Sequence, residues 1–175
     1  MGYKRLFIWV EGEDDQRFFE QIIAPKLLRK YDSVEIRRHA TLKEEKLDNF
    51  LKSIKAMGAE YIYVVDINNS PCVTAKKEEI RKKLKNIDEE KIIVVIKEIE
   101  SWYLAGLDNK EVKNFGIRRT FYNTDNVTKE KFNSLIPPRF SSRIDFMLEI
   151  LKKFSIETAK QKNESFKYFI EKYKS

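Results

Sequence analysis

Short apolar runs alternate with longer amphipathic segments along the first 107 residues. Residues 5–10 (Arg-Leu-Phe-Ile-Trp-Val) form a nearly continuous apolar run, which is typical of a strand buried on both faces of a parallel sheet. Comparable runs follow at residues 33–39, 61–65 and 92–96. Helical periodicity fills the intervals, in residues 16–30, 41–57 and 74–86. This alternation predicts an α/β, Rossmann-like fold with a four-stranded parallel sheet flanked by helices.

Local signals predict where the first two helices begin and end. Asp14 is the expected N-cap of the first helix and Thr41 that of the second, because their side chains accept hydrogen bonds from the first helical turn. Gly58 is expected just past the end of the second helix, since glycine adopts the left-handed conformation common there.

Strand-like runs stop after residue 107, and helices are expected in residues 128–135, 139–154 and 156–173. We therefore expect an α/β core in residues 1–107 and a basic helical extension in residues 108–175, packed together as one domain. The chain has 35 Lys+Arg against 28 Asp+Glu, a net charge of +7. Residues 1–100 hold 20 of these bases and 19 of these acids, so the positive excess lies in the C-terminal part. A basic balance favours an anionic partner such as nucleic acid.

Several classes of protein are excluded by composition. Cys72 is the one cysteine and His39 the one histidine, which excludes a disulfide framework, a zinc-thiolate cluster and a multi-histidine metal site. We expect Cys72 to be a small filler residue and His39 to occupy a mobile, solvated position. No apolar run approaches the about 20 residues of a membrane span, so we expect no membrane partner and a reduced, cytoplasmic location. Glycine-rich nucleotide motifs are absent, so any nucleotide energy must come from a separate partner such as an ATPase.

Acidic and amide side chains follow three of the four predicted strands. The carboxyl ends of parallel strands meet at one edge of a sheet, where ligands bind. Gathered carboxylates repel one another, and a Mg²⁺ or Mn²⁺ ion removes that penalty and supports phosphoryl transfer. Each acid taken singly also fits a helix cap or a solvated loop. The side chains that carry the metal hypothesis are Glu11, Asp15, Asp66, Asn68, Glu98 and Glu100.

These segments resemble Toprim domains. Val10-Glu11-Gly12-x-x-Asp15 resembles the Glu-Gly-x-x-Glu opening of Toprim domains of the overcoming-lysogenization-defect nuclease type. Asp66-Ile-Asn, after a later strand, resembles the Toprim Asp-x-Asp motif. Residues 98–105 are similar to the Glu-x-Trp-hydrophobic segment of small stand-alone Toprim-like proteins of unknown function, and residues 159–166 to their basic C-terminal helix. The resemblance implies a four-stranded parallel Toprim sheet.

The resemblance also implies a role for each matching residue. Glu11 would be a general acid/base or a metal ligand, Asp66 would bind Mg²⁺ directly, and Glu100 would complete the catalytic set. Asp15 and Asn68 occupy the second acidic positions of the two motifs and would join the metal ligands. Asp15 is shorter than Glu, and Asn68 offers a carbonyl oxygen without a charge. Those two departures favour, as an alternative, a catalytically degenerate module that binds nucleic acid or a partner protein.

Basic side chains of the helical part would contact nucleic-acid phosphates. The lysines of residues 76–85 are instead expected on a solvated helix face. The leading hypothesis is a Mg²⁺- or Mn²⁺-dependent nuclease or phosphodiester-transfer protein. A further alternative is a receiver-like phosphoacceptor that is phosphorylated on Asp66, although the fifth strand and lysine of that fold are missing. The expected phosphate-contacting residues are Arg118, Arg119, Arg139, Arg143, Lys160 and Lys162.

Overall fold

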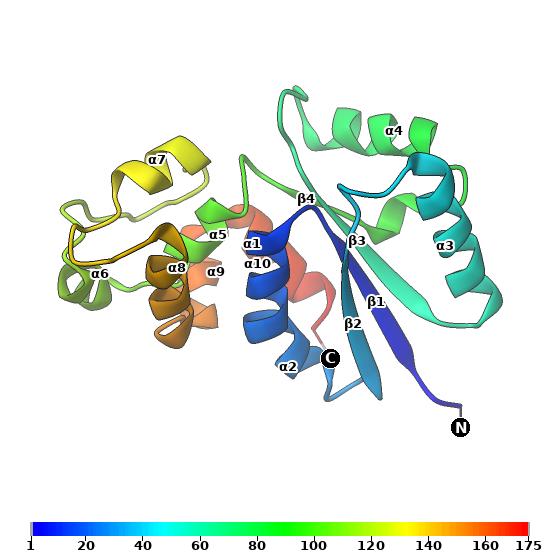
Figure 1. Ribbon diagram of the computed structural model, residues 1–175, viewed down its shortest axis with the longest axis horizontal. Helices are drawn as coiled ribbons and strands as arrows, with labels where there is room; N and C mark the ends of the chain where they lie inside the picture. Colours follow the sequence, from blue (N-terminus) through cyan, green and yellow to red (C-terminus); the bar gives the residue numbers. More distant parts are fainter. Residues whose placement is uncertain (1, 175) are drawn as a thin grey trace. The chain divides into compact units, whose positions relative to one another are not determined.

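A computed structural model of the protein describes residues 2–174. Its sheet has four parallel strands in the order β2-β1-β3-β4, flanked by helices (Figure 1). The α/β fold expected from the sequence is thereby confirmed, as are the helices at the C-terminal end. The strands are β1 (Arg5–Val10), β2 (Ser33–Arg38), β3 (Glu60–Asp66) and β4 (Ile92–Val95).

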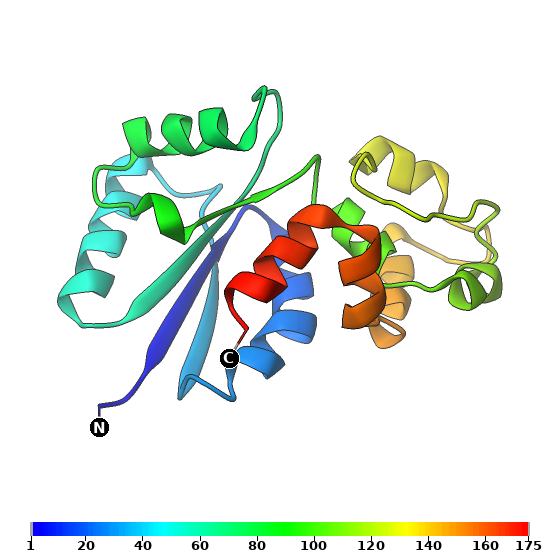
Figure 2. The same ribbon diagram turned by 180° about the vertical axis from the view of Figure 1, so that it is seen from behind.

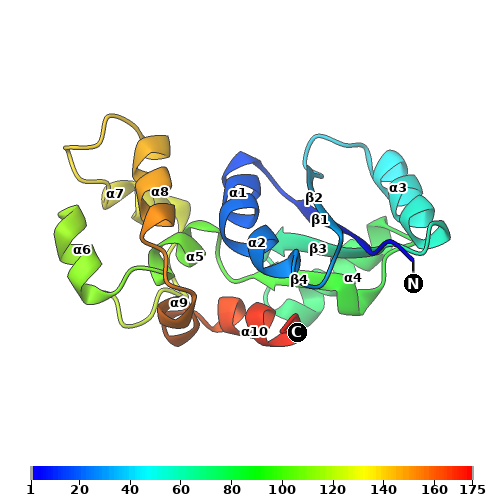
Figure 3. The same ribbon diagram turned by 90° about the horizontal axis from the view of Figure 1, so that it is seen from below.

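Helical segments connect each strand to the next. The run from α1 through α2 joins β1 to β2, α3 joins β2 to β3, and α4 lies between β3 and β4. Figures 1 and 3 show the strands lying between α1 and α2 on one side and α3 on the other. The segments are α1 (Glu13–Phe18), the π-helical η1 (Phe19–Ile23), α2 (Ala24–Leu27), α3 (Glu44–Ala56), α4 (Val73–Lys83) and the 3-10 helix η2 (Glu89–Lys91).

Strand β1 is apolar along its length because both of its faces are covered. Phe7 and Trp9 belong to a core cluster that includes Leu51 of α3 and Ile80 of α4, so these two helices cover one face of the sheet. The alternate residues of β1 are also buried. A strand with neighbours on both edges and helices over both faces needs the continuous hydrophobic run seen in this sequence.

The first helix begins earlier than predicted and is not capped by Asp14. Helix α1 starts at Glu13, and the Asp15 carboxylate accepts a hydrogen bond from the Gly12 backbone N–H (3.3 Å). Asp14 instead forms an ion pair with Arg17 (2.8 Å). The expectation was wrong because an acidic side chain in the first turn can reach back to the cap residue, which serves the same need as a cap side chain.

Two other local expectations also need correction. Thr41 does not cap α3, which begins at Glu44 with Lys43 at its N-cap position. Cys72 is not a buried filler; it is exposed at the N-cap of α4, where its sulfur accepts from the Ala75 N–H (3.5 Å). The glycine expected after α3 does have the left-handed conformation of a helix C-terminus (φ +69°).

The chain divides into two compact units, one ending at Val94 and the other beginning at Val95. The division falls before α5, which packs against α7, α8 and α9. Figure 2 shows the helices of the second unit from behind. They are α5 (Glu100–Ala105), α6 (Asn109–Phe115), α7 (Lys129–Ser134), α8 (Arg143–Lys152), α9 (Ile156–Lys162) and α10 (Glu164–Lys172).

A buried polar network interrupts the last predicted helix at Asn163. This residue caps α10 by accepting from the Phe166 N–H (3.0 Å), and its amide donates to Ser101 Oγ and Thr124 Oγ1. Ser165 Oγ in turn accepts from Trp102 Nε1 (2.9 Å). Because buried polar groups are costly unless hydrogen-bonded, this network joins α5 to the α9–α10 junction in one arrangement.

Aromatic side chains fill the core of the second unit. Phe132, Phe146, Phe166 and Phe169 are each at most 1% exposed. Phe154 lies near Phe166, with 5.8 Å between ring centroids. Phe146, Phe154, Phe166 and Phe169 recur at helical spacings with Ile and Leu, which is typical of core positions, and all of them except the half-buried Phe154 are fully buried.

We expect Gly106→Ala to destabilise the protein by about 1–3 kcal/mol, the usual cost of overpacking. A Cβ at Gly106 would overlap the ring of Phe154. Gly12→Ala is the matched control, because its Cβ would meet nothing closer than 3.9 Å and its φ of −142° suits alanine. Urea unfolding measures both variants. A loss below about 0.5 kcal/mol for Gly106→Ala, the range of ordinary surface substitutions, would contradict the overlap.

Candidate functional site

The carboxyl ends of β1 and β3 meet where the order of the strands reverses. Strand β1 pairs with β2 on one edge and with β3 on the other, and its pairing with β3 reaches Trp9 and Tyr63. Beyond that point, the Asp66 backbone N–H donates to Glu11 Oε1 at 2.9 Å. The fold therefore brings together two of the residues that the sequence singled out. In open α/β sheets, the crevice at such a reversal is the usual place for a ligand.

A cavity of about 350 Å³ opens beside Glu11 in the first unit. Asn68 also lines it, at a turn where its backbone is left-handed (φ +50°), a conformation that asparagine tolerates better than most residues. Asp66, at the end of β3, is 8% exposed. The other charged residues of the lining are Glu44, Glu79, Lys76 and Lys83, so acids outnumber bases in the cavity.

Lys76 is the most enclosed cation of this cavity. It is 5% exposed, and its Nζ lies 3.5 Å from Glu79 Oε1. The expectation of a solvated position is therefore wrong for Lys76, because α4 turns this position inward together with the buried Ile80. The spacing of four residues between Lys76 and Ile80 is the sequence signal that places both on one helix face.

His39 is buried, which corrects the expectation of a mobile, solvated side chain. Its Nε2 donates to the Val64 carbonyl (2.9 Å), and its ring stacks on Tyr63 with 4.4 Å between centroids. Burial lowers the pKa of His39 to about 4 and raises that of the Tyr63 hydroxyl. His39 is therefore a neutral wall of the cavity near pH 7 and carries its proton on Nε2.

Asp15 has a structural contact at Gly12, next to Glu11, which together with Asp66 is called the carboxylate pair below. It is 6% exposed, and its Oδ2 accepts from the Gly12 N–H at the start of α1. An acid at this position also interacts favourably with the positive end of the helix. The structure therefore gives Asp15 a role in holding the β1–α1 turn, and its role as a metal ligand remains a prediction.

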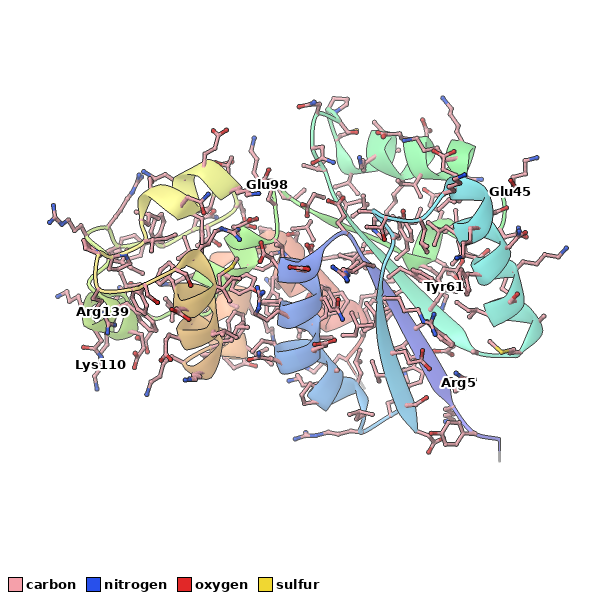
Figure 4. All side chains as sticks on the ribbon, in the orientation of Figure 1. Arg5, Glu45, Tyr61, Glu98, Lys110 and Arg139 are labelled. Carbon is pink, nitrogen blue, oxygen red and sulfur yellow. The ribbon has the colours of Figure 1, made fainter. Side chains whose placement is uncertain are left out.

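Glu100 and Glu98 lie in the second unit, each with a clear partner. Glu100 Oε1 accepts from Arg143 Nη2 at 2.5 Å, with the Glu100 side chain 5% exposed. Arg143 Nε donates to Asn133 Oδ1 (2.7 Å). Glu98, labelled in Figure 4, accepts from the backbone N–H of Lys129 at the start of α7. A buried ion pair of this kind is costly to break, so Glu100 and Arg143 hold α5 to α8.

The expected basic surface is smaller than the count of cations suggests. Lys162 was expected to contact a phosphate, but it is only 8% exposed and its Nζ donates to the Leu107 carbonyl (2.6 Å). Burial lowers the pKa of its ammonium group. Its ammonium therefore faces a backbone carbonyl inside the unit and not a phosphate. Lys160 lies 3.7 Å from Glu157 and is half-buried.

The predicted phosphate-contacting arginines also differ in how many contacts they make within the protein. Arg139, labelled in Figure 4, stacks on Phe140 with 4.4 Å from its guanidinium carbon to the ring centroid, and its Nε donates to the Phe115 carbonyl. Arg118 and Arg119 are exposed, with Arg119 lying 5.4 Å over Phe121. Of the predicted phosphate-contacting residues, Arg118, Arg119 and Arg139 are exposed.

Comparison of the chain with models of protein families, with curated proteins and with solved structures finds no match. Within residues 2–174, no three His, Cys, Asp or Glu side chains form a group suited to holding one metal ion. No helix in this described part of the chain is both long enough and apolar enough to cross a membrane. A function must therefore be argued from Glu11, Asp66 and the cavity beside them.

Wild-type stability should fall more steeply on acidification than that of His39→Gln. Because the pKa of His39 is about 4 in the folded protein and about 6.5 when unfolded, the unfolded chain binds the extra proton between these values. The unfolding free energy therefore drops by up to about 1.4 kcal/mol per pH unit from about pH 6.5 to about pH 4. Urea unfolding of both proteins across this range measures the difference, and a difference that stays constant with pH would contradict the buried neutral state.

Proposed function

We propose that this protein is a Toprim-like, Mg²⁺- or Mn²⁺-dependent nuclease or phosphodiester-transfer protein that acts on nucleic acid. The observation that carries the proposal is the contact of Glu11 with Asp66 where the strand order reverses. The Glu11 carboxylate lines the cavity, and Asp66, the last residue of β3, contacts Glu11 through its backbone N–H. Their carboxylate oxygens are the kind of ligand that these hard cations prefer.

The donor set fits a single ion better than a pair of ions. Mg²⁺ is commonly bound through one or two carboxylates, with water and substrate phosphates completing its shell. Glu11 and Asp66 would supply the carboxylates, and Asn68 an amide oxygen from the same cavity wall as Glu11. When bound, such an ion polarises a phosphate and lowers the pKa of a water molecule.

Other residues of the cavity would orient and stabilise a phosphodiester. Lys76 places an ammonium group in the lining, where a cation would offset the charge that develops on phosphoryl oxygens. The neutral His39 and the apolar side chains of Leu42 and Leu47 would exclude water and strengthen these electrostatic interactions. Glu11, half-buried, is the proposed proton acceptor for the attacking water.

Replacing Glu11 by Gln should abolish metal-dependent cleavage. The amide oxygen of Glu11→Gln can still accept from the Asp66 N–H, so this change removes charge and retains the acceptor at that position. We expect Mn²⁺ affinity, measured by calorimetry, to fall at least about tenfold, which is about 1.4 kcal/mol. Cleavage of single-stranded and double-stranded DNA and of RNA is assayed on the same samples.

Glu13→Gln is the matched control for this experiment. Glu13 lies two residues away and forms an exposed ion pair with Arg38 (3.2 Å), so its charge is lost without a change at the carboxylate pair. Mn²⁺ affinity should stay at the wild-type level in this variant. Failure of the wild-type protein to bind Mn²⁺ would overturn the catalytic proposal, and cleavage that survives in Glu11→Gln would exclude Glu11 from it.

Asn68 favours the second candidate function, a degenerate Toprim-like module that binds nucleic acid or a partner protein without cleaving it. An amide holds a divalent cation more weakly than a carboxylate does, and Asn68 lines the same cavity as Glu11. A receiver-like phosphoacceptor is less favoured, because the sheet described in residues 2–174 ends at β4 and has no fifth strand to carry a lysine.

Introducing a carboxylate with Asn68→Asp separates the first two candidates. In a working site, a third carboxylate beside Glu11 and Asp66 should tighten Mn²⁺ binding about tenfold or more and raise the cleavage rate. Asn69→Asp, on the neighbouring residue of the same loop, adds the same charge as a control. Tighter Mn²⁺ binding without any cleavage would support the binding module, and equal effects of the two variants would mean that charge alone was measured.

A further inference from the structure

A second hollow, of about 370 Å³, lies in the first unit at the carboxyl end of β2. Its charged lining residues are all cationic: Arg37 and Arg38 at the end of β2, and Lys46 in α3. Gln16 and Thr41 add neutral hydrogen-bonding groups. We propose that this hollow binds a phosphate group of the nucleic-acid backbone and anchors the strand beside the carboxylate pair.

Aromatic contacts hold the guanidinium of Arg37 in place. Its central carbon lies 5.8 Å from the ring centroids of both Phe7 and Phe50. A guanidinium fixed against rings loses less freedom when it binds a ligand, and its planar fork matches phosphate oxygens. The position of Arg37 is therefore preorganised for phosphate, whereas a lysine there would be a mobile point charge.

The carboxylates nearest to these arginines do not neutralise the hollow. Arg37 pairs with Glu35 (2.9 Å) and Arg38 with Glu13 (3.2 Å). All four side chains are more than a third exposed, and ion pairs in that setting contribute only about 0–1 kcal/mol. A phosphate can therefore compete for the guanidinium donors, and neither Glu35 nor Glu13 lines the hollow itself.

Leu42 lines both this hollow and the cavity that contains Glu11. The two spaces thus share a wall, with cations on one side and an excess of acids on the other. Fixed cations can bind one phosphate of a polyanion. The neighbouring phosphate can lie beside acidic residues when a metal ion binds both the phosphate and those residues. This pairing of charges fits a phosphodiester chain better than it fits a single small anion.

The identity of the ligand rests on the proposed function, whereas the sign of its charge rests on the hollow alone. An isolated phosphate or a mononucleotide has the same phosphate chemistry as a backbone. The experiment therefore measures oligonucleotide binding in EDTA, where the carboxylate pair holds no metal ion, and separately measures binding of inorganic phosphate.

The test uses a short fluorescein-labelled single-stranded DNA and fluorescence anisotropy. The variant Arg37→Gln/Arg38→Gln/Lys46→Gln removes the three cations of the hollow. The matched control Lys26→Gln/Arg29→Gln/Lys30→Gln removes three exposed cations. These lie between α1 and β2, before the amino end of β2, whereas the hollow lies at its carboxyl end. We expect the Kd of the hollow variant to rise at least tenfold over the control. Its salt slope should fall by at least about 0.7, which is the contribution of one phosphate contact on a single strand.

A double variant, Arg38→Gln/Lys46→Gln, leaves the stacked Arg37 intact and guards against misfolding, which far-UV circular dichroism also checks. It should weaken binding by an intermediate amount. Equal oligonucleotide affinity of the hollow variant and the control would overturn the proposal. A hollow variant that loses inorganic phosphate binding and retains oligonucleotide binding would also overturn it. Mn²⁺ calorimetry on the hollow variant keeps the two proposals distinct, because a wild-type metal affinity together with lost DNA binding places the defect in the hollow.

Discussion

The parallel pairing of β1 with β3 is the constraint on which the candidate site depends. The two strands pair as far as Trp9 and Tyr63, and just beyond this point the Asp66 N–H donates to Glu11 Oε1. A buried backbone N–H must find an acceptor, and here a carboxylate provides it. Hydrogen bonds to charged groups contribute about 1.5–3 kcal/mol. This contact therefore links the carboxyl ends of β1 and β3 and holds Glu11 beside the cavity.

Charge in this protein is distributed by contacts that a count of residues does not reveal. The second unit carries most of the positive excess, yet Lys162 donates to a backbone carbonyl, Arg143 pairs with Glu100, and Arg139 stacks on Phe140. In the first unit, where bases and acids nearly balance, the fold separates them into an acidic cavity and a cationic hollow. Local separation of charge, and not net charge, therefore determines where an anion can bind.

Buried polar groups give each unit a defined interior. His39 remains neutral against the Val64 carbonyl, which makes it part of the cavity wall in the first unit. In the second unit, Ser165 Oγ donates to Asn163 Oδ1 and accepts from the indole N–H of Trp102. Such groups require particular partners, unlike apolar side chains, which accept many packings. They explain why the chain turns at Asn163 where hydrophobic periodicity alone predicted a continuous helix.

Hydrophobic periodicity is a local property of the chain, and it was enough to predict the α/β class and the four parallel strands. It also placed Glu11 and Asp66 at the ends of predicted strands, since strand ends are visible in the sequence. Which charged side chains are buried, and which lie together, depends instead on packing between distant segments. Lys76 is turned inward by α4, and Arg37 and Lys46 line one hollow although they come from β2 and α3. Such contacts join residues that are distant in the chain, so no local pattern records them.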